Sequence, residues 1–154
     1  GAQVTQLNVG EVNDLFEVRI SLIGLAGRLA AERRDPKFLA RMRVGVKRLS
    51  EIAKSGGDAD TYTSAVYRLN LMLAESTGNR FLRNMVYSLA HQTLRYSRLG
   101  LSTPKRRAQS ARNWRLLLAV AQGNEPKAAQ AAAEKLVRDS RDTAVKMLRQ
   151  KKAG

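Results

Sequence analysis

The sequence predicts an all-α fold, an antiparallel bundle of about six helices. Apolar residues recur at three- and four-residue steps along most of the 154 residues, as they do on the buried face of a helix. No stretch alternates apolar and polar residues or clusters β-branched ones, so we expect no sheet. Capping residues, glycines and prolines separate the periodic segments at short intervals. Short connections between successive helices favour antiparallel neighbours.

The first two helices are expected over residues 9–34 and 36–54. The first carries an apolar stripe at heptad-like spacing, made of Leu15, Val18, Leu22, Leu25 and Leu29. Phe16, Ile20 and Ile23 widen this stripe, so the helix is expected to be covered on more than one side. The first helix ends before Pro36, because the residue preceding a proline avoids the α region. The second ends at a Ser-Gly-Gly break.

Four further helices are expected after that break. Asp58 or Asp60 caps the third, and the fourth runs from residue 80 to near residue 100. The fifth starts at Pro104 and is followed, after Gly123-Asn124, by a sixth that ends near residue 150. Gly123 is expected to take the left-handed conformation that ends a helix, and Asn124 to cap the next one. The two arms of this hairpin are about equally long, so Asn113 and Lys135 are expected at similar depth.

The composition argues against several classes of function. At 154 residues the chain is long enough for one domain with a core. With no cysteine and one histidine, His91, it lacks disulfides, thiolate chemistry and most transition-metal sites. It contains no phosphate-binding loop or hydrolase motif, so we expect no enzyme activity. No apolar run approaches the roughly 20 residues of a membrane span, and no membrane partner is expected.

The net charge of +15, from 28 Lys+Arg against 13 Asp+Glu, favours a polyanionic partner. The basic residues are spread over 33–54, 105–107 and 146–152, and the few aromatic residues do not interleave with them. That pattern is weak support for a single-strand stacking surface. A basic helical nucleic-acid-binding protein therefore stays open as one alternative, and a helical scaffold or adaptor without a small-molecule site as another.

Three segments, in this order and spacing, resemble the FCD domain, the effector-binding C-terminal half of FadR-type GntR transcription regulators. They are DLFEVRISLIGLAGRLAAERRD, LNLMLAESTGNRFL and ARNWRLLLAVAQGNEPKAAQAAAEKL. The resemblance covers about residues 14–148. It implies that residues 11–150 form a cytoplasmic, homodimeric ligand-binding domain for a small carboxylate-type or acyl effector. Operator DNA would be bound by an N-terminal winged helix-turn-helix domain that is absent here, and residues 1–10 would be a linker or tag remnant.

The resemblance also indicates candidate site residues. Many family members hold a metal with one aspartate and three histidines, and the matching positions here are Val66, Asn70, Asn113 and Lys135. These side chains do not replace carboxylate and imidazole ligands, so no metal cofactor is expected. The same four positions remain candidates for effector binding. If buried, the Lys135 ammonium would take an effector carboxylate in place of the metal; otherwise Lys135 points to solvent. Arg19 matches the family's first-helix arginine and is a second candidate for the carboxylate, through its bidentate fork.

Overall fold

In the computed structural model, which describes residues 6–153, the chain forms seven helices and no strand. Their bounds are α1 (Val9–Arg33), α2 (Pro36–Lys54), α3 (Ala59–Ser76), α4 (Arg80–Gln92), α5 (Leu94–Gly100), α6 (Pro104–Gln122) and α7 (Pro126–Ala153). The all-α expectation is confirmed. Half of the segment expected to be a linker or tag remnant, residues 1–5, lies outside the described residues. None of the described helices is both long and apolar enough to cross a bilayer.

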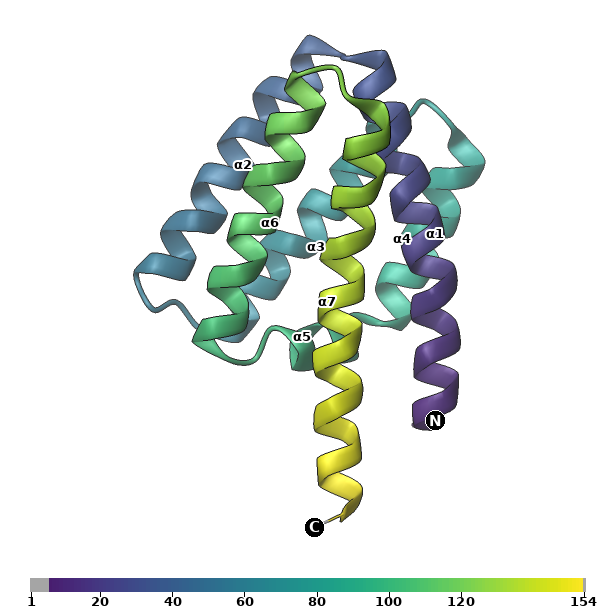
Figure 1. Ribbon diagram of the computed structural model, residues 1–154, viewed down its shortest axis with the longest axis vertical. Helices are drawn as coiled ribbons and strands as arrows, with labels where there is room; N and C mark the ends of the chain where they lie inside the picture. Colours follow the sequence, from purple (N-terminus) through teal and green to yellow (C-terminus); the bar gives the residue numbers. More distant parts are fainter. Residues whose placement is uncertain (1–5, 154) are drawn as a thin grey trace, which may run out of the picture.

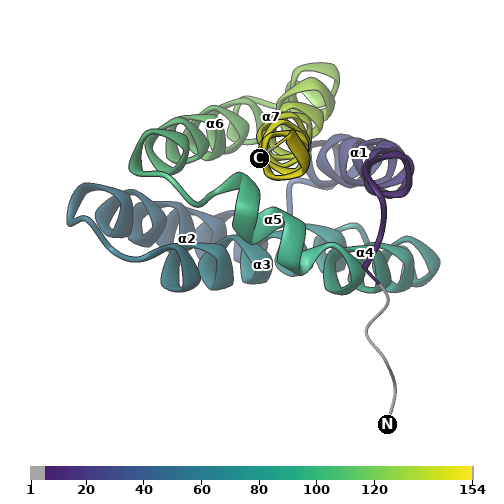
Figure 2. The same cartoon turned by 90° about the horizontal axis from the view of Figure 1, so that it is seen from below.

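The helices pack in two layers (Figures 1 and 2). Helices α6, α7 and α1 lie side by side in one layer, and α2, α3 and α4 form the other. Helix α7 packs on both α1 and α6, α2 packs on both α6 and α3, and the short α5 packs against α7. The large side chains between the layers form one core, which includes Phe16, Ile23, Met42, Leu49, Tyr62, Leu73, Trp114 and Leu117. This arrangement leaves α5 and the middle of α1 facing the same part of the interior.

Small residues allow α1 and α7 to approach closely. A Cβ atom at Gly27 would lie 2.8 Å from the Cβ of Ala133 and 2.9 Å from the carbonyl oxygen of Ala129. A Cβ at Gly24 would lie 2.7 Å from the side chain of Glu134. Backbones in such close contact have no room for added methyl groups, so the register of α1 on α7 is fixed by these positions.

Capping residues define the helix starts. Asn8 and Glu11 form a capping box at α1, and Asp58, not Asp60, caps α3 by accepting a hydrogen bond from the backbone N–H of Thr61. The turn between α6 and α7 differs from the expectation. Asn124 takes the left-handed conformation, with φ 57°, and Gly123 does not, with φ −76°. Asparagine tolerates this conformation better than most other residues with a Cβ, so Asn124 takes the left-handed position that was expected of Gly123.

The apolar stripe expected at the centre of the first helix lies at the edge of the core instead. Val18 is 52% exposed, and the four leucines of that stripe are half-buried. Phe16, Ile20 and Ile23, which were expected only to widen the stripe, face the core together with Val12 and the alanines of α1. Arg19 is buried with them. The physical reason is that α7 contacts the small residues of α1, which turns the leucine stripe toward the outside.

The fourth expected helix is broken at Thr93, which gives seven helices where about six were expected. Thr93 has φ −100° and ψ 4°, and it joins the end of α4 to the start of α5. Its hydroxyl donates to the carbonyl oxygen of Leu89 at 2.7 Å, and it accepts a hydrogen bond from Arg19 at 3.3 Å. The helix therefore breaks at the residue whose hydroxyl contacts the buried side chain of Arg19.

Candidate functional site

Arg19 places a guanidinium group inside the bundle. Its side chain is only 6% exposed, and its carbon Cζ lies 5.6 Å from the ring centroid of Phe16. Nη1 donates to the hydroxyl oxygen of Ser97 at 2.8 Å and to that of Thr93 at 3.3 Å. These two hydroxyls lie one turn apart at the α4–α5 joint. Sequence reasoning did not single them out, because the segment around them also contains Gln92, Arg95 and Arg98, so two small polar residues there are not a distinctive signal.

The charge of Arg19 has no counter-ion in the part of the chain that the structure describes. Within residues 6–153 no carboxylate forms an ion pair with it, and neither Nε nor Nη2 has a protein hydrogen-bond partner. Burial lowers the pKa of Arg19 to about 10, which still leaves the group protonated at neutral pH. A buried charge without an opposite charge is costly for folding. The unpaired edge of the guanidinium is also the geometry that receives a carboxylate through two parallel hydrogen bonds.

Arg19 lines a small interior void together with Val66 and Asn70. The void has a volume of about 20 Å³, and its other lining residues are Ser97, Leu101, Ser110, Trp114, Leu136, Val137 and Ser140. The Nδ2 atom of Asn70 donates to the carbonyl oxygen of Val66 at 3.1 Å, whereas its buried Oδ1 has no hydrogen-bond partner among the described residues. A void of this size accommodates one water molecule, and it is lined by the polar groups that such a molecule needs.

Two further arginines make this end of the interior electropositive. Nε of Arg106 donates to the carbonyl oxygen of Gly100 at 3.0 Å, and Nη1 of Arg107 donates to that of Leu101 at 3.0 Å. Both side chains are largely buried. Burial lowers the pKa of Arg106, and the nearby carboxylate of Asp139 opposes that change. Three buried or nearly buried guanidinium groups therefore surround the region between α1, α5 and α6.

The structure separates the other two candidate residues from the void. Asn113 and Lys135 lie at the same depth on α6 and α7, because both donate to Oδ2 of Asp139 at 3.0 Å. The side chain of Lys135 is 49% exposed, and neither residue lines the void. The structure thus brings together Arg19, Val66 and Asn70, and places Asn113 and Lys135 outside. Lys135 therefore points to solvent, which is one of the two alternatives considered for it, and is not buried.

The residues at the family's metal-ligand positions do not fit a metal ion. Val66 has no donor atom, and the Asn70 amide nitrogen is bonded to the backbone. The other two positions pair with Asp139 away from the void. Over the described part of the chain, no group of three His, Cys, Asp or Glu side chains is placed to hold a metal.

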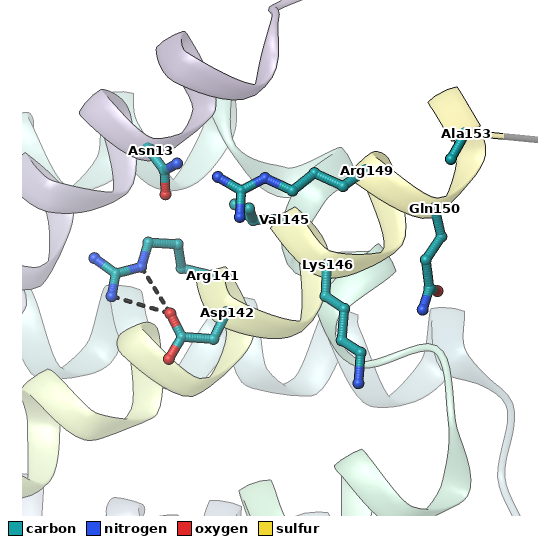
Figure 3. Close-up of a pocket in the computed structure, with 8 residues that line it drawn as sticks. All are labelled: Asn13, Arg141, Asp142, Val145, Lys146, Arg149, Gln150 and Ala153. Carbon is teal, nitrogen blue, oxygen red and sulfur yellow. Dashed lines mark hydrogen bonds and ion pairs between the residues drawn. The ribbon is translucent and has the colours of Figure 1, made fainter.

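An open groove lies between the second turn of α1, where Asn13 stands, and the C-terminal part of α7 (Figure 3). Its volume is about 560 Å³, and the residues that line it are Asn13, Arg141, Asp142, Val145, Lys146, Arg149, Gln150 and Ala153. Arg141 is paired with Asp142 at 3.0 Å, which leaves Lys146 and Arg149 as the cations without an ion-pair partner among the groove residues. This groove contains part of the basic 146–152 segment, and it is open to solvent.

A second groove lies between α3 and the α4–α5 joint. Its volume is about 600 Å³, and it is lined by Leu7, Asp60, Thr63, Ser64, His91, Gln92, Leu94, Arg95, Tyr96 and Arg98. No motif in the sequence indicates it, because its residues come from three separate segments that only the fold brings together. Among these residues, Asp60 and Arg98 form an ion pair.

Comparison with known proteins identifies the family of this fold. No curated protein matches the sequence. A solved structure, Streptococcus agalactiae GntR, is similar in fold with a TM-score of 0.76 and 17% sequence identity, over 90% of this chain. The match spans 62% of the length of that GntR chain. The FCD domain family model matches residues 14–139. That match covers most of the helical bundle, and the chain therefore belongs to the FCD domain family.

Proposed function

We propose that this domain senses a small carboxylate through Arg19, and that the void beside Val66 and Asn70 marks the head-group position. The observation that carries this proposal is the buried guanidinium without a counter-ion. An effector carboxylate would supply the missing negative charge and accept hydrogen bonds from the Nε and Nη2 groups. The orphaned Oδ1 of Asn70 would accept a hydrogen bond from an effector hydroxyl or from a retained water.

Binding requires the interior to open. A void of about 20 Å³ is too small for a carboxylate-bearing metabolite, so side chains or a helix must move when the effector binds. Helix α5 is the element best placed to move, since it has seven residues, follows a break and has no side-chain cap at its start. An effector that favours the open arrangement shifts the population by its difference in affinity for the two arrangements.

As part of a GntR-type regulator, such a shift would alter how two DNA-binding modules are placed. We propose that operator DNA is contacted by a winged helix-turn-helix domain N-terminal to this one, in a cytoplasmic homodimer. The coupling would act through α1, because its first turn is close to the N-terminal end of the domain and its middle carries Arg19. Effector and operator would then influence each other's binding reciprocally.

The leucine stripe of α1 is the surface that we propose for the homodimer. Its members repeat every seven residues in two registers, at 15, 22 and 29 and at 18 and 25, which is the pattern of a helix pair. The first half of α1 is acidic and its last turns are basic, so an antiparallel α1 of a second copy would pair opposite charges. We expect Val18→Asp to yield monomers by analytical ultracentrifugation. An unchanged sedimentation coefficient would place the dimer surface elsewhere.

The effector proposal is tested by thermal melts of the domain with a panel of small carboxylates and sugar acids. A ligand at 100 times its dissociation constant adds about 2.7 kcal/mol, which raises the Tm by several degrees. We expect a carboxylate that stabilises the unchanged protein and the Lys135→Ala variant, and that has no effect on Arg19→Met. Equal stabilisation of all three proteins would rule out Arg19 as the carboxylate ligand.

Direct nucleic-acid binding is the second candidate, and the groove of Figure 3 is the observation that favours it. Lys146 and Arg149 would contact phosphates along the groove, without base recognition. Binding of a DNA duplex by the isolated domain would then weaken steeply with salt. No binding at 50 mM salt would exclude this function for the domain alone.

A further inference from the structure

The groove between α3 and the α4–α5 joint has an apolar floor and a basic rim. Leu7, Leu94 and Tyr96 supply apolar surface, while His91, Arg95 and Arg98 bring nitrogen-containing side chains to the edge. With about 600 Å³ the groove is within the size range of small-molecule sites, whereas the void beside Arg19, at about 20 Å³, has room for one water molecule only.

A thin wall separates this groove from the guanidinium of Arg19. A second interior void, of about 10 Å³, lies between them. It shares Thr63 and Leu94 with the groove, and it shares Arg19, Val66, Asn70 and Ser97 with the larger void. The three spaces therefore follow one another from the surface to the buried charge. The side chains of Thr63 and Leu94 stand at the boundary between the outer space and the inner ones.

Both boundary residues have features that packing alone does not explain. The hydroxyl of Thr63 is buried, with the residue 4% exposed, and has no hydrogen-bond partner among residues 6–153. An unpaired buried hydroxyl is costly, and a polar ligand group or a water molecule passing this point would satisfy it. Leu94 is 37% exposed although it is a large apolar residue, and it directly follows the helix break at Thr93. A side chain at a broken helix is easily displaced.

The charges at the rim suit an anion. Arg98 is paired with Asp60, so its charge is largely balanced. Arg95 has no ion-pair partner among the described residues, and its guanidinium carbon lies 5.8 Å from the ring centroid of Tyr96. The cations at the rim therefore outweigh the single carboxylate, and they raise the local concentration of an anionic ligand.

We propose that the groove is the outer compartment of the effector site, and that the effector is a carboxylate with an apolar substituent. This inference rests on the proposed function of Arg19. The carboxylate passes between Thr63 and Leu94 to the guanidinium, and the apolar part stays in the groove against Leu7, Leu94 and Tyr96. A compact, fully hydrophilic acid would fill the inner position and leave the groove empty.

The test uses straight-chain carboxylates from acetate to octanoate, with affinities measured by calorimetry on the whole domain. If methylene groups enter the groove, each one should tighten binding about fourfold. Ser64→Trp fills the groove from an exposed position of α3 and should weaken octanoate binding at least tenfold, with acetate binding unchanged. Arg68→Trp is the matched control, because Arg68 is also exposed on α3 and does not line the groove.

The outcomes separate this inference from the function on which it rests. One outcome is that acetate binding depends on Arg19, but affinity does not rise with chain length and Ser64→Trp has no effect. This result would overturn the assignment of the groove to the effector site and would still support the proposal that Arg19 binds a carboxylate. A chain-length gain that persists in Arg19→Met would show that the groove is independent of the buried charge, and would also overturn the inference. If no carboxylate binds in an Arg19-dependent way, both proposals fail.

Discussion

Replacing Arg19 by methionine is expected to make the unliganded protein more stable, although it removes two hydrogen bonds. Burial lowers the pKa of Arg19 well below its usual range, to about 10, and at about 1.36 kcal/mol per pKa unit this corresponds to a folding cost of about 3 kcal/mol. Methionine occupies a similar volume without a charge to desolvate. The lost bonds to Ser97 and Thr93 cost about 1 kcal/mol each.

The net expectation is a gain of about 1 kcal/mol in the free energy of unfolding, or a Tm that is about 2–4 °C higher for a chain of this size. Urea titration followed by circular dichroism measures it. Arg115→Met is the matched control, because Arg115 donates to the hydroxyl of Ser50 at the surface and should change stability by less than about 0.5 kcal/mol. A loss of 1 kcal/mol or more in Arg19→Met would refute the reasoning, since Arg19 would then be a net structural contributor.

The stability that Arg19→Met gains over the unchanged protein should also depend on pH, and it should decrease at high pH. The folded-state pKa of Arg19 is depressed, so below about pH 10 the group is charged in both states and the full penalty is present. Above about pH 10 the folded protein releases the proton before the unfolded chain does, and the penalty disappears as the pH rises further. The stability difference between Arg19→Met and the unchanged protein should therefore be constant up to about pH 9 and smaller at pH 11.

Three further predictions follow from the packing and the ion pairs. Lys135→Ala should change the free energy of unfolding by less than about 1 kcal/mol, because its ion pair with Asp139 is half exposed; a larger loss in urea titration would mean that the pair is structural. Gly27→Ala should destabilise the protein by about 1–3 kcal/mol, because the new methyl group meets the backbone of α7. Gly10→Ala, at the exposed first turn of α1, is the control and should not destabilise it. Equal losses of stability in the two variants would contradict the close packing of α1 on α7. Zn²⁺ or Ni²⁺ should leave the Tm unchanged, and a metal-dependent rise lost in the Asn113→Ala variant would show that a metal site exists.

The helices were predictable from the sequence because apolar spacing and caps agree along most of the chain. The break at Thr93 was not, since residues 89–94 carry no glycine or proline and the apolar pattern continues through them. It arises from tertiary contacts, in which Arg19 and the carbonyl oxygen of Leu89 share the Thr93 hydroxyl. The burial of the α1 face opposite to the one expected also depends on tertiary contacts. The small residues of α1 that face α7 give no strong hydrophobic signal in the sequence.

The candidate site was predictable only in part. The family resemblance pointed to Arg19, Val66 and Asn70, which the fold brings to one void. It also pointed to Asn113 and Lys135, which pair with Asp139 instead. Sequence spacing gives the depth of a residue along a helix but not the direction of its side chain relative to neighbouring helices, and here that direction decides which residues reach the interior.

The central claim, that Arg19 binds a carboxylate, is tested most directly by NMR of the arginine side chains. In a sample with ¹⁵N-labelled arginine, the Nε–Hε resonance that is missing from Arg19→Met is assigned to Arg19. We expect this resonance to shift saturably when a stabilising carboxylate is added, because the new hydrogen bond forms at Nε or at the adjacent Nη2. If the Arg19 resonance does not move while those of exposed arginines do, carboxylate binding takes place at the surface and the account is contradicted.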